Sequence, residues 1–340
     1  MQLSTTEANP EPPGANVLEI VTRDKVTLRA AYWNCGDVCS GTVAILPGHA
    51  EFIEKYFEVI GELLSRGFDV AILDWRSQGR SQRLARNPHK GHTGNFRAYE
   101  RDLDAFAEQI LAPFCRPPWY ALCHSMGGAI ALAKARTGHS PFSRLVLTSP
   151  MIDLYGLRFR RSIEALARAL VWFGQGRRFV PRGARHSHAL DRFEANIVTS
   201  DPVRHARTAE IVKAAPYLAI GDPTIGWLNA AFRLMRRFRE PEFPRRLLTP
   251  VLIVAAGSDH LVDSAATEEF AQLLKAGKCI TIPGAKHEIL MEREPFRELF
   301  WAAFDAFLPG EGSAHDQFRG EEDTASIAGA GQRQLGRGGR

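Results

Sequence analysis

The feature that most constrains this chain is a serine that stands between a strand pattern and a helix pattern. Residues 118–122 are typical of a short buried strand, and residues 127–135 repeat small and apolar side chains with helical spacing. Ser125 lies between them, with Cys123 two residues before it and Gly127 two residues after it. Gly-x-Ser-x-Gly turns of this kind are strained and lift the serine hydroxyl above the edge of a sheet. We therefore predict a strand–turn–helix unit with Ser125 as a candidate nucleophile.

Short β-branched runs alternate with longer helical patterns over most of the chain, which is typical of βαβ units around a parallel sheet. We expect strands at residues 17–22, 27–33, 42–46, 69–74, 119–123, 145–148, 251–255 and 279–282. We expect helices at residues 55–65, 99–111, 126–136, 265–274 and 296–307. The sequence thus predicts an α/β fold with a mainly parallel sheet flanked by helices.

The alternation stops between Tyr155 and Arg246, where only amphipathic helical stretches such as residues 162–173 and 225–238 occur. We interpret residues 151–246 as a helical cap, or lid, inserted into the sheet domain. The sheet domain then consists of two sequence segments, and both ends of the chain have the polar, Pro-rich or Gly-rich composition of disordered segments. The expected boundaries are 1–16 for the disordered N-terminus, 17–150 and 247–308 for the sheet domain, and 309–340 for the disordered tail.

The expected cap is strongly basic. Residues 155–246 carry 18 Lys and Arg against 8 Asp and Glu, a net charge of +10, whereas the whole chain carries +5, so the remaining residues sum to −5. An isolated basic helix is commonly a solvated surface. Charge gathered on one insertion also suits an anionic substrate or an anionic membrane surface, so both interpretations stay open.

Composition indicates one large domain: the chain has 340 residues, 45% of them hydrophobic, and no run of eighteen uncharged apolar residues. The first ten residues lack the pattern of a secretory signal, so we expect a cytoplasmic protein whose basic cap contacts the inner face of the membrane peripherally. The cysteines are odd in number and lack Cys-x-x-Cys spacing, which argues against a disulfide framework and against a zinc site. We expect free thiols at Cys35, Cys39, Cys115, Cys123 and Cys279.

A serine hydroxyl needs a histidine to accept its proton and a carboxylate to orient that histidine. In a sheet of this kind the partners follow the serine in the order Asp, His, each on a loop beyond the carboxyl end of a strand. The strand pattern at residues 251–256 leads into Gly-Ser-Asp259, and the pattern at residues 279–282 leads into a loop with His287. We predict that Asp259 and His287 assist Ser125.

Each partner has a structural alternative when it is taken alone, because an aspartate often caps a helix and a single histidine is often structural. Asp263 competes with Asp259, but it stands directly before a helix pattern, where N-capping explains it. His124 is next to Ser125 in sequence, yet neighbours on a tight turn do not face one another, so we expect it to point elsewhere.

Acyl transfer also needs two backbone N–H groups aimed at the developing oxyanion. The residue after the nucleophile, Met126, supplies one of them. The other is expected from the Gly-containing turn after the strand at residues 42–46, where the N–H of His49 is the candidate. Taken alone, that turn also fits a simple loop.

Together these residues resemble the α/β-hydrolases, and among them the branch of monoacylglycerol lipases and bacterial lysophospholipases, with its serine aminopeptidase-like hydrolase domains. The resemblance covers residues 17–308. Its motifs are Pro47-Gly-His-Ala-Glu51 with Lys55-Tyr56, Gly67-Phe-Asp-Val70, Asp74-Trp-Arg-Ser-Gln-Gly-Arg-Ser81, Gly91-His-Thr-Gly-Asn-Phe96, His124-Ser-Met-Gly-Gly-Ala129, Gly257-Ser-Asp259 and Gly284-Ala-Lys-His287-Glu-Ile-Leu290. The Pro-Gly opening and residues 222–227 are closer to the lysophospholipases.

The resemblance implies a catalytic triad with its oxyanion hole, made of Ser125, Asp259, His287 and the N–H groups of His49 and Met126. It implies no metal or cofactor, because triad chemistry is self-contained. Two positions depart from the family pattern: Cys123 stands where glycine or alanine is usual, and Ser77 stands where glycine is usual. We expect Ser77 to be a tolerated loop change and Cys123 to bear on the strain of the turn.

The function that follows is a serine hydrolase that cleaves carboxylic esters of single-chain lipids through an acyl-enzyme on Ser125, with a lysophospholipase as the leading interpretation. The cap aromatics Trp172, Phe173, Trp227 and Phe232 would hold the acyl chain, and the basic charge would meet a phosphate-bearing head group. The alternatives are a monoacylglycerol lipase, a small-ester carboxylesterase, a peptidase-type hydrolase and a non-catalytic binding protein. We expect no nucleic-acid partner, and the oligomeric state stays open.

Overall fold

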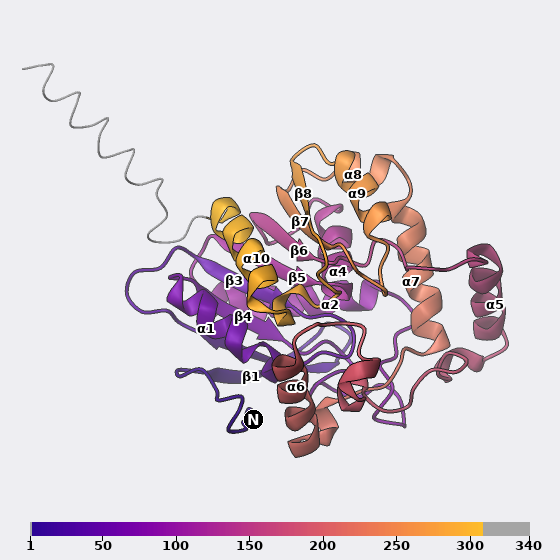
Figure 1. Cartoon of the computed structure of the whole chain (residues 1–340), viewed down its shortest axis with the longest axis horizontal. Coiled ribbons are helices and arrows are strands. Elements are labelled where there is room, and N and C mark those ends of the chain that lie inside the picture. The colour runs from indigo at the N-terminus through magenta and orange to yellow at the C-terminus, as the bar shows by residue number, and fades with distance from the viewer. Residues whose placement is uncertain (1, 309–340) are drawn as a thin grey trace, which may run out of the picture.

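The computed structural model describes residues 2–308, which fold around one eight-stranded sheet (Figure 1). The strands are β1 (Asn16–Val21), β2 (Thr27–Trp33), β3 (Thr42–Leu46), β4 (Asp69–Leu73), β5 (Trp119–His124), β6 (Arg144–Thr148), β7 (Val251–Ala256) and β8 (Gly277–Ile282). They lie in the order β1-β2-β4-β3-β5-β6-β7-β8. Every expected strand is present, with ends that differ from expectation by at most two residues.

The sheet is mainly parallel, as the sequence predicts. β1 and β2 form an antiparallel hairpin, β2 pairs antiparallel with β4, and the pairs from β4 through β8 are parallel. β3, β4 and β7 are buried along their whole length, which is the rule for parallel strands covered by helices on both faces. The carboxyl ends of β3, β5, β7 and β8 consequently meet at one edge of the sheet.

Helices cover both faces of the sheet (Figure 1). One face carries α1 (Phe57–Ser65) and α10 (Glu294–Phe307), and the other carries α2 (Arg97–Phe106), α4 (Met126–Ala135) and α9 (Ser264–Gln272). In α1 the buried residues Phe57, Ile60 and Leu63 recur at helical spacing. Shorter helical segments lie at Ile53–Tyr56, Ala107–Leu111, Ala112–Phe114, Gln175–Arg177, His188–Leu190, Phe193–Ala195, Pro216–Leu218 and Ile289–Met291.

The helices of the expected cap stand between β6 and β7: α5 (Arg160–Trp172), α6 (Pro202–Ala214), α7 (Ile225–Phe238) and α8 (Glu242–Arg245). α7 has the expected bounds, and its buried residues Trp227 and Phe232 join the apolar cluster that contains α4. α5 packs against α7 at the outer edge of the molecule, and of its thirteen residues only Ala167 is buried (Figure 1). Among residues 2–308 no helix is long and apolar enough to span a membrane.

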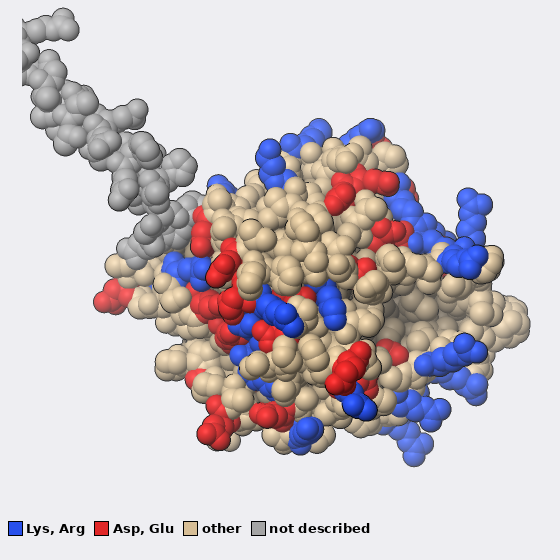
Figure 2. All heavy atoms as spheres, in the orientation of Figure 1, with Lys and Arg blue, Asp and Glu red and all other residues tan. Residues whose placement is uncertain are grey.

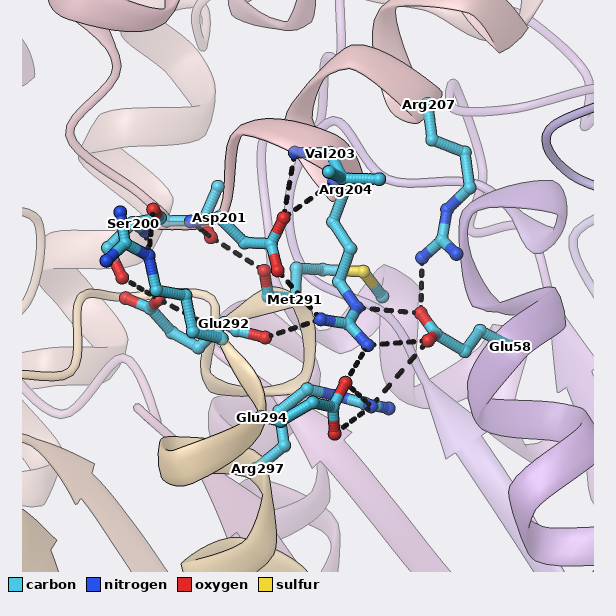
Figure 3. Close-up of polar contacts among 12 residues, drawn as sticks. Glu58, Ser200, Asp201, Val203, Arg204, Arg207, Met291, Glu292, Glu294 and Arg297 are labelled. Atoms are coloured by element: carbon cyan, nitrogen blue, oxygen red, sulfur yellow. Dashed lines mark hydrogen bonds and ion pairs between the residues drawn. The ribbon is translucent and has the colours of Figure 1, made fainter.

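An ion-pair network centred on Arg204 ties α6 to both α1 and α10 (Figure 3). The Arg204 guanidinium donates to both carboxylate oxygens of Glu58, at 2.8 and 2.6 Å, and it also pairs with Glu294. Its Nη1 donates to Asp201 Oδ2 at 2.8 Å and to the Glu292 carbonyl at 2.9 Å. Because Arg204 is buried, losing one partner would leave a costly uncompensated charge, so we infer that the network holds α6 firmly.

The N-terminal residues differ from the expectation of disorder. Leu3 joins the core beneath α1 and α10, and Asn9, which is 3% exposed, donates its Nδ2 to the Glu54 carbonyl at 2.9 Å. Trp33 Nε1 donates to the Pro12 carbonyl at 3.0 Å. Residues 2–16 are thus anchored by specific hydrogen bonds, which composition does not predict. The expected disordered tail, residues 309–340, lies outside the described residues.

Candidate active site

Ser125 occupies a strained turn between β5 and α4. Its φ of 49° and ψ of −110° lie outside the regions that non-glycine residues favour. Two backbone bonds fix the turn: Ser125 N–H donates to the Thr148 carbonyl at 3.0 Å, and Met151 N–H donates to the Ser125 carbonyl at 3.0 Å. At Gly127 a Cβ would stand 2.1 Å from the Leu46 carbonyl oxygen, so this position must be glycine. The half-exposed serine therefore sits at the carboxyl edge of the sheet.

The two departures from the family pattern have distinct structural settings. Cys123 is fully buried in β5 between Leu46 and Leu147, and burial raises the pKa of its thiol well above the ordinary value. The thiol is therefore neutral and packs as a small apolar side chain. Ser77 has a φ of 65°, in the left-handed region that favours glycine, and its Oγ accepts the Leu84 N–H at 3.1 Å.

Asp259 and His287 meet beyond the ends of β7 and β8. Asp259 Oδ2 and His287 Nδ1 are 2.7 Å apart, and Asp259 Oδ1 accepts the N–H groups of Leu261 and Val262 at 2.8 and 3.0 Å. Burial raises the pKa of Asp259, but the His287 hydrogen bond and the two amide donors outweigh burial and hold the pKa below its ordinary value. Asp259 is therefore an ionised acceptor that orients His287. Asp263 caps α9 as predicted, accepting the Ala266 N–H at 3.1 Å.

The histidine ring lies beside the serine turn. The ring centroids of His287 and His124 are 4.8 Å apart, and His124 directly precedes Ser125. Among the described residues no side-chain hydrogen bond involves Ser125 Oγ; such bonds commonly tighten only when substrate binds. His124 Nδ1 pairs with Thr148 Oγ1 at 3.1 Å, and burial lowers the pKa of His124 to about 4, so this neutral ring is engaged elsewhere, as expected.

The two candidate oxyanion donors come from the turn after β3 and the start of α4. Met126 is the first residue of α4, so its N–H lacks an intrahelical acceptor, and no other acceptor for it lies within the described chain. His49 N–H likewise has no hydrogen-bond acceptor among residues 2–308. The His49 ring lies 4.7 Å from the Trp227 ring, and burial lowers the pKa of His49 to about 4. The Trp227 ring of α7 thus packs against an uncharged His49 ring on this turn.

A buried polar network, whose role the sequence pattern does not reveal, lies behind the site. Lys55 Nζ bridges Glu51 Oε1 at 2.8 Å and Glu288 Oε1 at 2.6 Å, and Tyr56 OH donates to Glu51 Oε2 at 2.6 Å. Burial raises the pKa of Glu51, but the Lys55 ammonium outweighs it and holds the pKa at about 2. Glu288 follows His287, so this network links the turn after β3 to the histidine loop. The family motifs contain these residues, and that membership is their only sequence signal.

The four cap aromatics do not form one cluster. Trp227 and Phe232 are 4% and 2% exposed on α7, and the Trp227 ring packs 5.4 Å from that of Phe96. Trp172 and Phe173 stand on the outer end of α5 and are 80% and 66% exposed. Only the α7 pair therefore faces the core, contrary to the expectation that all four aromatics line one acyl site.

One cluster of metal-ligating side chains lies within the described residues. Cys35, Cys39 and Asp69 bring one ligand atom each within 4.8 Å of one another. The Asp69 carboxylate already accepts from Arg116 Nε at 2.9 Å and from Arg116 Nη2 at 2.7 Å. The cluster lies at the amino end of β4, at the opposite end of the strands from Ser125. All five cysteines are free, as the sequence predicts.

Several known proteins are similar to this chain in sequence. Residues 38–294 match the family described as serine aminopeptidase, S33. The chain is 32% identical over 270 residues to lysophospholipase L2 of Escherichia coli K12, covering 76% of this chain and 77% of that protein. It is 27% identical over 270 residues to a monoacylglycerol lipase of Mycolicibacterium smegmatis, covering 75% and 83%.

Solved structures agree with the fold. A soluble variant of monoglyceride lipase from Saccharomyces cerevisiae, in complex with a substrate analog, has a TM-score of 0.69 at 18% identity and covers 89% of this chain and 98% of its own. A carboxyl esterase from Bacillus coagulans has a TM-score of 0.69 at 18% identity, covering 87% and 98%. The predicted fold class is confirmed, and the chain belongs to the serine aminopeptidase S33 family of α/β-hydrolases.

Proposed function

We propose that this protein is a serine hydrolase that releases fatty acid from lysophospholipids through an acyl-enzyme on Ser125. The observation that carries the proposal is the 2.7 Å contact between Asp259 and His287, at the sheet edge that also bears the strained Ser125 turn. An oriented histidine beside a partly accessible serine is the arrangement that acyl transfer requires.

The reaction proceeds in two balanced halves. His287 accepts the Ser125 hydroxyl proton as Oγ attacks the ester carbonyl, and the N–H groups of His49 and Met126 bind the resulting oxyanion. The ester C–O bond then breaks, and the proton passes from His287 to the leaving glycerol oxygen. Water repeats the sequence on the acyl-enzyme, which restores Ser125 and releases the fatty acid. Asp259 stays ionised throughout and stabilises the imidazolium.

Similarity to lysophospholipase L2 supports the choice of a lipid with one acyl chain, and the distribution of charge supports a phosphate-bearing head group. Much of the positive charge of the cap has no counter-charge. Within the described chain, nine exposed cap arginines form no ion pair: Arg158, Arg161, Arg168, Arg177, Arg178, Arg182, Arg185, Arg233 and Arg237. Lys and Arg side chains gather around the α5 end of the molecule (Figure 2). Their summed field attracts anionic head groups.

The outer face of α5 supports peripheral contact with an anionic membrane. Phe159, Leu166, Trp172 and Phe173 are 71%, 55%, 80% and 66% exposed along this helix and its flanks. The unpaired arginines of α5 stand among them. Exposed aromatic and leucine side chains interleaved with arginine suit the boundary between head groups and acyl chains. We propose that α5 rests on the bilayer from which the substrate is taken.

Monoacylglycerol lipase activity is the second candidate, favoured by the 27% identical relative. Hydrolysis rates on a substrate panel rank the two. Fatty acid release is measured for a lysophosphatidylglycerol, a lysophosphatidylethanolamine and a monoacylglycerol with the same acyl chain, p-nitrophenol release for a short p-nitrophenyl ester, and amine release for a peptide amide. We expect kcat/KM for the lysophospholipids to exceed that for the monoacylglycerol by about tenfold, equivalent to about 1.4 kcal/mol. A faster monoacylglycerol would select the second candidate, and a faster peptide amide would overturn both.

A further inference from the structure

The turn after β3 contains three consecutive backbone N–H groups, and buried side chains occupy the outer two. Gly48 N–H donates to Glu51 Oε2. Ala50 N–H donates to Gln78 Oε1 at 2.6 Å. The N–H of His49, which stands between them, is left without an acceptor among residues 2–308. One donor of the turn is thus kept for a ligand.

The turn has a strained backbone and is closely packed by side chains. Ala50 has a φ of 64°, a left-handed conformation that a residue with a Cβ adopts at a cost. At Gly48 a Cβ would stand 2.9 Å from Glu51 Oε2 and 3.0 Å from His124 Cδ2, so the side chains close in on the backbone. The acceptor oxygens of Glu51 and Gln78 therefore supply hydrogen bonds that hold this strained shape.

Gln78 also reaches the other side of the proposed oxyanion hole. It is 0% exposed and comes from the loop after β4. Its Nε2 lies 3.9 Å from Met126 Sδ, while its Oε1 accepts the Ala50 N–H. One buried side-chain amide therefore contacts both the residue after His49 and the side chain of Met126.

We propose that Gln78, together with Glu51, is a positioning residue that sets the oxyanion hole by holding the N–H groups on both sides of His49. This inference rests on the proposed function. Oxyanion donors act through preorganisation, so their distance to the developing charge matters more than their mere presence. Gln78 fixes the spacing between the two donors, and Glu51 fixes the direction of the turn through its bonds to Gly48 and Tyr56.

The test replaces the amide by an apolar side chain of similar length, Gln78→Leu. Complete loss of an oxyanion donor lowers kcat by about 10²–10³, so a misplaced donor should lower kcat by about 10–100-fold while KM stays within about twofold. Gln82→Leu is the matched control, because Gln82 Oε1 accepts the Thr27 N–H at 3.0 Å in the same loop but is exposed. We expect the control to keep the kcat of the unaltered protein.

A second measurement separates positioning from general damage. An alkyl boronic acid forms a tetrahedral adduct with the serine and places an oxygen in the hole, whereas a fatty alcohol of equal length only fills the acyl site. Gln78→Leu should weaken boronic acid binding by about the same factor as kcat and leave the alcohol unchanged. Glu51→Gln, which keeps an oxygen for Gly48 N–H, should lose less kcat than Glu51→Leu.

Three outcomes would overturn the inference: an unchanged kcat in Gln78→Leu, equal losses in Gln78→Leu and Gln82→Leu, or equal weakening of the boronic acid and the alcohol. If Gln78→Leu fails to fold, the Glu51 pair decides by the same measurements. Fluorophosphonate labelling of the unaltered protein tests the proposed function separately. A labelled unaltered protein with a fully active Gln78→Leu would remove the positioning role and leave the hydrolase standing.

Discussion

Ser125, Asp259 and His287 each owe their place to the short segment that follows a strand. The serine stands on a strained turn in which a Cβ at position 127 would lie 2.1 Å from the Leu46 carbonyl oxygen, so only glycine fits there. The aspartate is held by two amides of its own loop, so it meets His287 in a fixed orientation. These local constraints explain why residue type and spacing predicted the Asp259–His287 pair and the separate capping role of Asp263.

Exchanging the two aspartates for asparagine distinguishes their roles. Asp259→Asn removes the acceptor that selects the His287 tautomer, so kcat should fall by about 10⁴. Asp263→Asn should cost far less activity and little stability, because asparagine caps a helix about as well as aspartate. Steady-state kinetics and thermal unfolding of both variants check this ranking. The reverse order would mean that Asp263, and not Asp259, orients His287.

Cys123 is packed too tightly to accept a larger side chain. Cys123→Leu should destabilise the fold by about 1–3 kcal/mol, since overpacking a buried strand forces its neighbours to move, and activity should fall with the displaced turn. Cys123→Gly should preserve activity or raise it modestly, because glycine relieves steric strain in the Ser125 turn. Urea unfolding and ester hydrolysis measure both effects. A fully active and stable leucine variant would show that the strand approaches the turn less closely than described.

The roles of Gln78 and Glu51 could not be predicted from the sequence. Their motifs are visible in the chain, but their roles depend on side chains that reach backbone N–H groups of other loops. Such contacts exist only after β3, β4 and β5 have assembled. Periodicity and spacing describe single segments, so they located the three main residues and His49 yet could not identify the side chains that hold the His49 turn.

At the scale of elements, α5 and α7 have similar amphipathic patterns and opposite settings. Periodicity predicted both helices within two residues, but the lipid-ester interpretation placed the aromatics of both helices at one acyl site. α7 turns Trp227 and Phe232 into the core, whereas α5 leaves Trp172 and Phe173 outside. Which face of a helix docks is decided by its partners. For the same reason Arg160 on α5 pairs with Asp153 and Glu164, although it stands in sequence between Arg158 and Arg161, which form no ion pair within the described chain.

The exposed end of α5 should control membrane binding. The double variant Trp172→Ser with Phe173→Ser should bind anionic vesicles less tightly in a sedimentation assay and keep its activity on a soluble short-chain ester. Charge reversal at Arg158 and Arg161 should also weaken vesicle binding, and added salt should reproduce that effect, since exposed charges are screened beyond about 8–10 Å at physiological ionic strength.

Lys275→Glu with Lys278→Glu is the matched control, because both lysines are exposed and lie away from α5. This control should leave vesicle binding closer to that of the unaltered protein than the α5 reversal does. Equal losses in the two double variants would mean that only net charge matters and that α5 is a solvated surface.

Across the whole molecule, the insertion is attached unevenly. α6 is tied to α1 and α10 through Arg204 (Figure 3), whereas α5 contacts mainly α7. Within the insertion, the segment around His188 is joined to the segment before α7: His188 Nδ1 lies 2.7 Å from Asp191 Oδ2, and His188 Nε2 lies 3.0 Å from Asp222 Oδ1. The sequence predicted the insertion but neither the Arg204 network nor the contact between His188 and Asp222, because each joins separate segments of the chain.

The His188 junction should make stability depend on pH. Its hydrogen bond to Asp222 raises the pKa of His188 from 6.5 to about 9. Protonated His188 therefore stabilises the folded state. This contribution is fully present below pH 6.5 and is lost as the pH rises through about 9. The melting temperature of His188→Asn should therefore lie furthest below that of the unaltered protein at about pH 6, with the gap closing by about pH 10.

His139→Asn serves as the control for that experiment, because His139 is exposed and its side chain makes no hydrogen bond with the described residues. Its melting temperature should follow that of the unaltered protein at every pH. A gap for His188→Asn that stays constant with pH would mean that the junction is not ionic.

In the proposed reaction, Ser125 carries the acyl group of a lysophospholipid. The most direct test measures fatty acid release from one lysophospholipid by the unaltered protein and by Ser125→Ala, after circular dichroism has shown that both are folded. We expect turnover by the unaltered protein and a loss of at least about 10³-fold in the variant, since the covalent route is removed. Retained turnover in Ser125→Ala, or an unaltered protein that releases no fatty acid from any lysophospholipid, would show that Ser125 does not act on such a substrate in this way.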